Sequence, residues 1–163
     1  MTRILKVMLA LATLLAGSAI AAPIKPDIGL GVIQLGERES DFKKIFKGGD
    51  PMPVGETGGC TLYDIERPEI QRFMPWIDTD VMELTFAPAM HGGVQESILS
   101  IISVGITPEQ SIALAGEYKK LLGPSIPLDE HVESWKLKDG SMIHISHYSD
   151  HSSISFLSAD FKC

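Results

Sequence analysis

The chain has 163 residues, of which 44% are hydrophobic, two cysteines and a formal net charge of −7 at pH 7. This length and composition suit one globular domain with a sizeable core. The negative charge argues against binding to nucleic acid or to an anionic membrane surface.

The first 21 residues have the layout of an export signal. Arg3 and Lys6 give a basic start, residues 7–16 form an apolar segment, and residues 19–21 form a small-residue cleavage pattern. The apolar segment is short for a bilayer span, and no charged stop-transfer residues follow it. We therefore predict a cleaved signal peptide over residues 1–21, with an uncleaved anchor as the alternative.

Cleavage leaves a mature domain over residues 22–163 that works in the periplasm or outside the cell. It removes Arg3, Lys6 and no acidic residue, so the net charge changes from −7 to −9. No cysteine lies near the cleavage pattern, which argues against the lipid anchor of a bacterial lipoprotein. Such a charge fits a solvated exported domain or one that meets a basic partner.

Residues 30–105 are predicted to contain a short strand at residues 30–35, a helix and three longer strands. Ser40 is a suitable helix N-cap, and Phe42 and Ile45 fall on one helical face that ends before Gly48-Gly49. The longer strand candidates are residues 60–66, 79–86 and 97–104. Proline and glycine residues predict a loop at residues 50–59, and two prolines predict a loop with one helical turn at residues 67–77.

Residues 106–163 are predicted to contain a helix and three more strands. Thr107 and Gln110 form a capping box with Pro108 at the first helical position, so the helix begins here. It is expected to end at residue 122, before Gly123-Pro124. The strand candidates are residues 131–138, 141–148 and 153–160, with Asp139-Gly140 as a two-residue hairpin turn.

Cys60 and Cys163 are predicted to form one disulfide. An even pair of cysteines in an exported protein most simply pairs, and the bond would tie the last residue of the chain to its middle. The alternative is a free reactive thiol or a thiolate metal ligand, although no second cysteine lies two residues from either one.

This order of elements predicts an α+β fold in which tandem helix-plus-antiparallel-meander halves form a single small domain. The halves are about residues 30–105 and 106–163. The aromatic-Lys-Lys-apolar pattern of residues 42–48 is similar to that of residues 118–123, which indicates an internal duplication, with chance as the alternative. The two meanders could join edge to edge, which would protect their exposed strand edges.

The pattern of Gly36, a polar N-cap, a short helix, a glycine and a meander resembles a known group of envelope proteins. The second half adds Leu121-Leu122-Gly123-Pro124, Trp135 and the Lys138-Asp139-Gly140 hairpin. In these features the chain is similar to the BamE (SmpA/OmlA) family and to the beta-lactamase-inhibitor-protein fold. The resemblance implies a protein that binds other proteins and has no catalysis of its own. Two departures are the missing lipid-bearing cysteine of BamE proteins and the single predicted disulfide, where the inhibitor proteins have more.

Four histidines are candidates for a zinc or copper site. His144, His147 and His151 cluster in sequence beside Asp150, and His131 comes shortly before them. On a strand, however, His144 and His147 differ by three positions and point to opposite faces. Histidines of a polar face and a turn are the alternative that we adopt, so we predict no cofactor and no metal.

No catalytic signature is present in the sequence. It lacks the Gly-x-Ser-x-Gly and His-Glu-x-x-His motifs, and Cys60 in its glycine-rich setting is assigned to the disulfide. The acidic groups within residues 78–83 and 129–133 are expected on solvated faces. The methionines near prolines are expected in the core or at a binding surface rather than at a copper(I) site. We therefore predict that the chain is not an enzyme.

An apolar run of Phe73, Met74 and Trp76 between charged residues is a candidate protein contact, with a core plug as the alternative. His147 and Tyr148 on the last hairpin form a second candidate surface. The sequence thus predicts an exported protein-binding module, an inhibitor or immunity-type protein of a secreted or periplasmic enzyme with a basic surface. The alternatives are an envelope-assembly accessory and a periplasmic zinc or copper binding protein.

Overall fold

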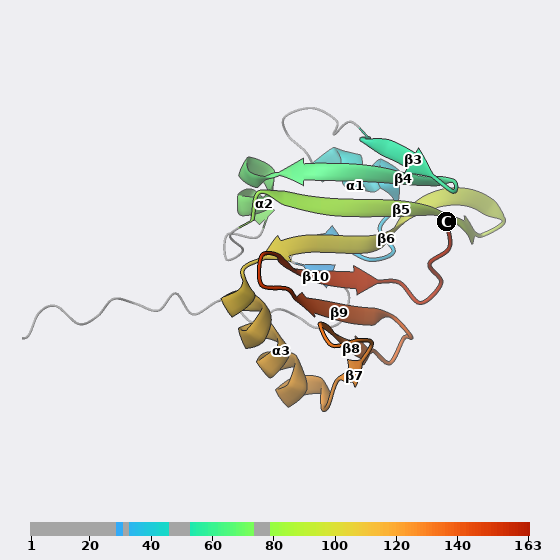
Figure 1. Ribbon diagram of the computed structural model, residues 1–163. Helices are drawn as coiled ribbons and strands as arrows, with labels where there is room; N and C mark the ends of the chain where they lie inside the picture. The colour runs from blue at the N-terminus through green and yellow to red at the C-terminus, as the bar shows by residue number, and fades with distance from the viewer. Residues whose placement is uncertain (1–28, 31–32, 46–52, 74–78) are drawn as a thin grey trace, which may run out of the picture.

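Eight strands form one antiparallel sheet in the computed structural model (Figure 1), which describes residues 29–30, 33–45, 53–73 and 79–163. The order across the sheet is β3-β4-β5-β6-β10-β9-β8-β7. The strands are β3 (Gly55–Thr57), β4 (Cys60–Glu66), β5 (Val81–His91), β6 (Val94–Ile106), β7 (Ile126–Pro127), β8 (Val132–Lys136), β9 (Met142–His147) and β10 (Ser152–Leu157). Two short strands, β1 (Gly29–Leu30) and β2 (Ile33–Gln34), pair with each other separately. The pairing of β6 with β10 joins the first four strands of this sheet, β3 to β6, to the last four, β7 to β10.

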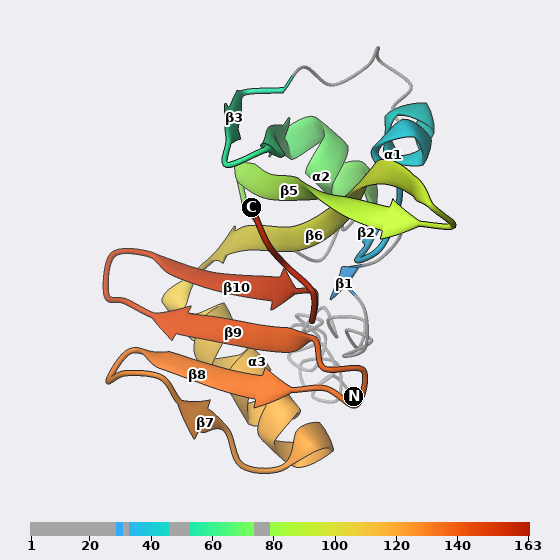
Figure 2. The same cartoon turned by 90° about the vertical axis from the view of Figure 1, so that its right-hand side faces the viewer.

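The three described helices pack on one face of this sheet. They are α1 (Glu39–Ile45), α2 (Arg67–Phe73) and α3 (Pro108–Leu122). The side chains that they bury in the same core as the strands are Phe42, Ile70, Ala115 and Tyr118. Figure 2 shows α3 behind β8, β9 and β10.

The longest described helix, α3, has the bounds that the sequence predicts. Thr107 Oγ1 accepts a hydrogen bond from the Gln110 amide at 3.2 Å, and Gln110 Oε1 accepts one from the Thr107 amide at 3.0 Å. This reciprocal pair satisfies two amides that have no partner within the helix. At the other end Gly123, with φ 88°, donates its amide to the Lys119 carbonyl and ends the helix.

One row of buried side chains crosses six strands on the helix-covered face. The row is Tyr63, Leu84, Ile102, Phe156, Ile143 and Trp135, each the register partner of the next. None is more than 3% exposed. Phe42 of α1 packs on Tyr63 with ring centroids 5.7 Å apart, and Tyr118 of α3 packs on Trp135 at 5.6 Å. One core therefore extends under all the helices.

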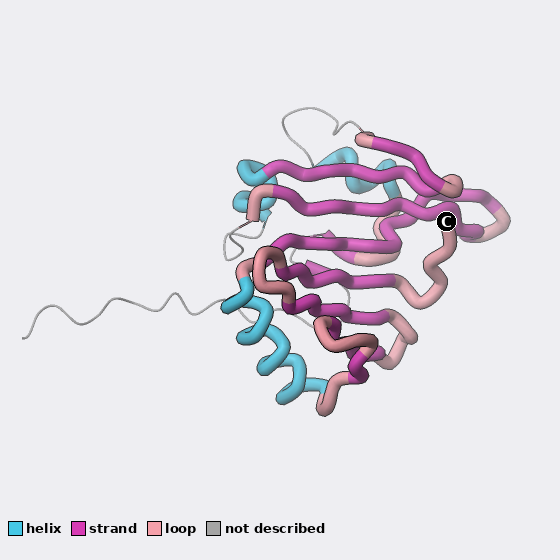
Figure 3. Tube along the Cα trace, in the orientation of Figure 1, coloured by secondary structure: helices cyan, strands magenta, loops and turns pink. Residues whose placement is uncertain are grey.

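The predicted α+β class with two helix-plus-meander halves is wrong. Strand makes up 47% of the described residues and helix 23%, and the strands β3 to β10 share one sheet (Figure 3). Local patterns identified β4 and α3 with their observed bounds. The suggested edge-to-edge joining of the two meanders occurs through the pairing of β6 with β10, but the patterns did not predict which strands pair or the full length of β5 and β6. These features make the molecule a β-rich domain built on a single sheet.

The two longest described strands, β5 and β6, form a hairpin that projects beyond β4. β5 pairs with β4 only as far as Phe86, but with β6 as far as His91. Gly92-Gly93, with φ of 58° and 83°, closes the hairpin in a backbone region that other residues rarely adopt. Pro88 lies where β5 has no β4 partner. The amide hydrogen that proline lacks is therefore not needed for a hydrogen bond to β4. We call residues 87–98 the β5–β6 arm.

The structure contains the predicted disulfide between Cys60 and Cys163. It joins the start of β4 to the C-terminal tail, residues 158–163, with Cα atoms 5.3 Å apart and a sequence separation of 103 (Figure 1). A Cβ atom on Gly58 would lie 3.1 Å from the Cys163 backbone, so the β3–β4 turn needs glycine at this close approach. The bond fits a protein of an oxidising compartment outside the cytoplasm.

Replacement of both cysteines by alanine is expected to lower the free energy of unfolding by about 4–5 kcal/mol, because the cross-link no longer restricts a long loop in the unfolded chain. Urea unfolding of the oxidised wild type, the reduced wild type and the double variant measures this effect. The reduced wild type and the variant should agree. Equal midpoints for the oxidised and reduced chains would contradict the prediction.

Candidate functional site

The second face of the sheet is not covered by any described helix. Side chains alternate along a strand, so the neighbours of the buried row point to this second face. A mainly apolar row of register partners crosses it, namely Leu62, Thr85, Ile101, Leu157, Met142 and Lys136. A polar row runs beside it, namely Asp64, Glu83, Ser103, Ser155, His144 and Ser134. We call these two rows the open face.

Hydroxyl groups link the middle strands of this side of the sheet. Ser103 Oγ and Ser155 Oγ share a hydrogen bond of 2.9 Å across β6 and β10. One step along the strands, Ser146 Oγ and Ser153 Oγ share one of 2.8 Å across β9 and β10. Because these hydroxyl groups already have protein partners, removing water from them on contact with another molecule costs less than it would for free hydroxyls.

An acidic depression lies at one end of the open face. Its volume is about 790 Å³, and the side chains of Asp64, Asp80, Glu83 and Asp150 all line it. Asp80 is paired with Arg67 at 3.1 Å, and Asp150 with Nδ1 of His151 at 2.7 Å. Hydrogen bonds from its own backbone amide and from His151 lower the pKa of Asp150, so this carboxylate stays charged.

The remaining two carboxylates of the depression carry unbalanced charge. Asp64 on β4 and Glu83 on β5 are register partners, so their side chains leave neighbouring strands on the same side. Both are exposed, and neither has an ion-pair partner among the residues that the structure describes. Two like charges on facing positions repel each other, and a cation placed between them relieves that repulsion. The depression therefore favours a lysine or arginine side chain over an anionic group.

His144 occupies the polar row in the second half of the sheet. Its ring is half-buried, and burial lowers its pKa, so the neutral imidazole is favoured. The register partner Ser134 is fully buried, and its Oγ has no hydrogen-bond partner among the described residues. The polar row therefore carries no negative charge at this end, and Lys136 lies beside it in the other row, in contrast to the acidic depression.

The histidines proposed as a metal site do not converge. His144 lies on the open face, whereas His147 contacts α3 on the helix-covered face, as their spacing predicts. The rings of His131 and His151 each pack on Tyr148, with centroid distances of 4.9 and 4.7 Å. Within the described residues no three His, Cys, Asp or Glu side chains are grouped to hold a metal ion. The geometry gives the zinc or copper alternative no support.

Ser111, His147 and Glu133 make a chain of the residue types found in hydrolases. Ser111 is only 1% exposed, and its Oγ donates to the Pro108 carbonyl at 2.8 Å. It therefore accepts from Nδ1 of His147, 2.9 Å away. Nε2 of His147 lies 3.4 Å from Glu133 Oε1. A buried hydroxyl that already donates its proton is not presented to a substrate. The hydrogen bond between Ser111 and His147 instead ties α3 to β9, and Nε2 of His147 faces the Glu133 carboxylate on β8 without a hydrogen bond among the described residues.

The carboxylate of Glu133 is fixed from the far end of α3. Lys119 lies 2.6 Å from Glu133 Oε2, and Ser125 Oγ donates to the same oxygen. Burial acts to raise the pKa of Glu133, and the hydrogen bonds from Lys119 and Ser125 outweigh it and lower that pKa. The network thus spans α3 from its first turn to its last.

The other residues predicted to bind a partner are only partly described. Phe73 ends α2, but its side chain, Met74 and Trp76 lie outside the described residues. His147 is assigned to the network under α3. Tyr148 is half-buried between two imidazole rings, beside the acidic depression that His151 also lines.

Sequence reasoning missed Asp64 and Asp150 as parts of one site. Asp64 alternates with buried residues in the predicted strand at residues 60–66, which places it on the solvent side. Its position beside Glu83 depends on strand register, and Asp150 reaches the depression through the β9–β10 turn. Neither relation has a local sequence signal.

Comparison of the chain with protein-family models, with curated proteins and with solved structures found no significant match. Among the described residues, no helix combines the length and hydropathy of a membrane span. The functional argument therefore depends on the geometry of this chain.

The lowered pKa of His144 predicts a loss of stability at acid pH. As the pH falls from about 8 to about 5, the unfolded chain binds a proton at this residue before the folded chain does, so the free energy of unfolding decreases. His144→Gln should flatten this pH dependence, whereas Ser103→Ala on the same face should retain it. Urea unfolding at several pH values measures the slopes. Equal slopes for wild type and His144→Gln would contradict the prediction.

Removal of the Ser111 hydroxyl tests the network under α3. Ser111→Ala leaves Nδ1 of His147 without its partner, and we expect the free energy of unfolding to fall by about 1–3 kcal/mol. Ser149→Ala, at an exposed turn position, is the matched control and should change stability little. An unchanged midpoint for Ser111→Ala in urea unfolding would show that the hydrogen bond does not stabilise α3.

Proposed function

We propose that the chain is an exported protein-binding module, an inhibitor or immunity-type protein that covers a secreted or periplasmic enzyme and has no catalytic activity of its own. The observation that carries this proposal is the open face, in which a mainly apolar row lies beside the acidic depression. A surface of this kind supplies both apolar area and charge for contact with a protein.

The partner that fits the open face carries a basic surface. Asp64 and Glu83 lie side by side without counter-ions among the described residues, and the whole chain is acidic. Complementary charge of this kind accelerates encounter with a basic partner and makes association depend on salt. The neighbouring row of Leu62, Ile101 and Leu157 provides apolar contact area that salt does not screen.

The cellular location also belongs to the proposal. The disulfide supports an oxidising compartment, and the basic and apolar start of the sequence supports export by a cleaved signal peptide. Residues 1–21 lie outside the described residues. Periplasmic and secreted enzymes are therefore the proposed targets, and an envelope-assembly role is the competing function.

A pull-down of envelope and secreted proteins with the tagged, oxidised chain over residues 22–163 tests the proposal. We expect capture of one stoichiometric enzyme, stronger at low than at moderate salt, whose activity falls to a minimum when the chain is added in equal amount. Mass spectrometry identifies the captured protein, and an activity titration measures inhibition. Capture of outer-membrane components alone, or of nothing, would contradict the proposed inhibition.

Charge reversal at the depression provides a matched comparison. Glu83→Lys should weaken binding by about tenfold or more, equivalent to ~1.4 kcal/mol, because it places a cation where the partner's cation binds. Glu117→Lys makes the same change at an exposed position of α3, away from the open face, and should bind like the wild type. Equal weakening by both variants would mean that net charge, and not the open face, determines affinity.

A further inference from the structure

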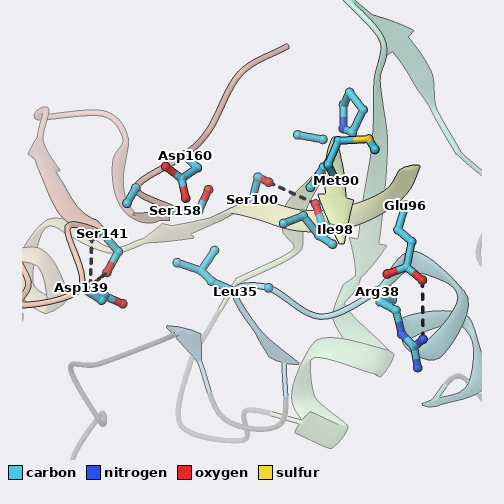
Figure 4. Close-up of a pocket in the computed structure, with 15 residues that line it drawn as sticks. Leu35, Arg38, Met90, Glu96, Ile98, Ser100, Asp139, Ser141, Ser158 and Asp160 are labelled. Atoms are coloured by element: carbon cyan, nitrogen blue, oxygen red, sulfur yellow. Dashed lines mark hydrogen bonds and ion pairs between the residues drawn. The ribbon is translucent and has the colours of Figure 1, made fainter. Parts of the chain in front are cut away.

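A second cleft, of about 630 Å³, lies at the base of the β5–β6 arm (Figure 4). Four segments line it, namely the arm, residues 35–38, the β8–β9 turn and the C-terminal tail. We call it the arm cleft. Its volume falls in the range of sites that hold small ligands or parts of a partner.

The middle of the arm cleft is apolar. Leu35, Ala87, Ala89 and Ile98 all line it. Ala87 and Ile98 are register partners, next to the Phe86 and Leu99 pair that belongs to the buried core. By alternation, Ala87 and Ile98 therefore lie on the same side of the sheet as the open face. A partner seated on the open face is on the correct side of the sheet to reach this cleft.

The two ends of the arm cleft differ in charge. Figure 4 shows Arg38 and Glu96 at one end, and Asp139 and Asp160 at the other. Arg38 lies 2.7 Å from Asp41 and 3.7 Å from Glu96, so its positive charge is already neutralised. No cation among the described residues lines the aspartate end, which leaves the described lining of the cleft with a net negative charge.

The two aspartates are prepared to accept a cation. The hydroxyl and the amide of Ser141 donate to Oδ1 of Asp139 at 2.6 and 3.0 Å and lower the pKa of that carboxyl. The second oxygen, Oδ2, is left for another donor. Asp160 in the C-terminal tail has no hydrogen-bond or ion-pair partner among the described residues. A fixed carboxylate and a free one thus lie at the same end of the arm cleft, next to its apolar middle.

We propose that the arm cleft is a subsite for a lysine or arginine side chain carried by the protein partner. The alkyl stem lies along Leu35, Ala87 and Ile98, and the cationic head pairs with Asp139 and Asp160. Long basic side chains combine these two properties, since their methylene stems pack on apolar surface while the charged end binds carboxylates. The origin of the side chain rests on the proposed function, whereas the binding of an alkyl cation is a property of this chain alone.

The test uses n-butylammonium, which has the stem and head group of a lysine side chain. Amide signals of the ¹⁵N-labelled, oxidised chain are followed by NMR during titration, with n-butanol as the neutral probe and butyrate as the anionic one. We expect saturable shifts at Ala87, Ile98 and Ser158 with n-butylammonium and not with the other two probes. An absence of saturable shifts, or equal shifts with n-butanol, would overturn the proposal.

Two variants locate the cation within the chain. Asp160→Asn should weaken n-butylammonium binding at the arm cleft by about fivefold or more, because it removes one of the two charges. Asp64→Asn, which changes the acidic depression, should leave binding at the arm cleft unchanged. Unchanged affinity in Asp160→Asn would show adventitious binding only and would overturn the assignment. Because no partner is present, this result is independent of the pull-down, and either proposal can fail without the other.

Discussion

The row of buried side chains from Tyr63 to Trp135 is the constraint on which the rest of the structure depends. It crosses six strands and lies against α1 and α3 through Phe42 and Tyr118. Because side chains alternate with a period of two, a shift of one residue in any strand would turn its buried members outward. The same alternation fixes which residues form the open face. The packing of the buried row therefore also determines that Asp64 and Glu83 lie side by side on the other face.

Local sequence patterns predicted an element correctly where the interactions that determine its bounds lie within one short segment. The capping box at Thr107 determines where α3 begins, and the alternation of residues 60–66 determines β4. The length and pairing of strands that are distant in sequence could not be predicted from local patterns. Gly92-Gly93 is a two-residue turn signal that would have extended β5 and β6, but Pro88, a residue type that is rare inside strands, argued against a strand through residues 87–91. An edge-to-edge joining of the two meanders was suggested by the need to protect strand edges, but no local pattern shows that β6 and β10 are the strands that pair.

The candidate site shows the same division. The spacing of His144 and His147 was enough to predict opposite faces, and one ring lies on the open face while the other contacts Ser111. The acidic depression instead collects carboxylates from several strands and turns, so it exists only after the strands are in register. The sequence shows which acidic residues are neighbours along the chain, but the electrostatic potential at a surface depends on which charges are close in space.

The two edges of the sheet are β3, with three residues, and β7, with two residues that include Pro127. A long unpaired edge presents a row of free amides and carbonyls on which another chain can add strand by strand. These two strands offer few such groups, and proline removes one donor from β7, so longer unpaired stretches among the described strands are confined to β4 beyond β3 and to the β5–β6 arm. Short edges thus protect against fibre-like aggregation without any helix having to cover the open face, which remains accessible.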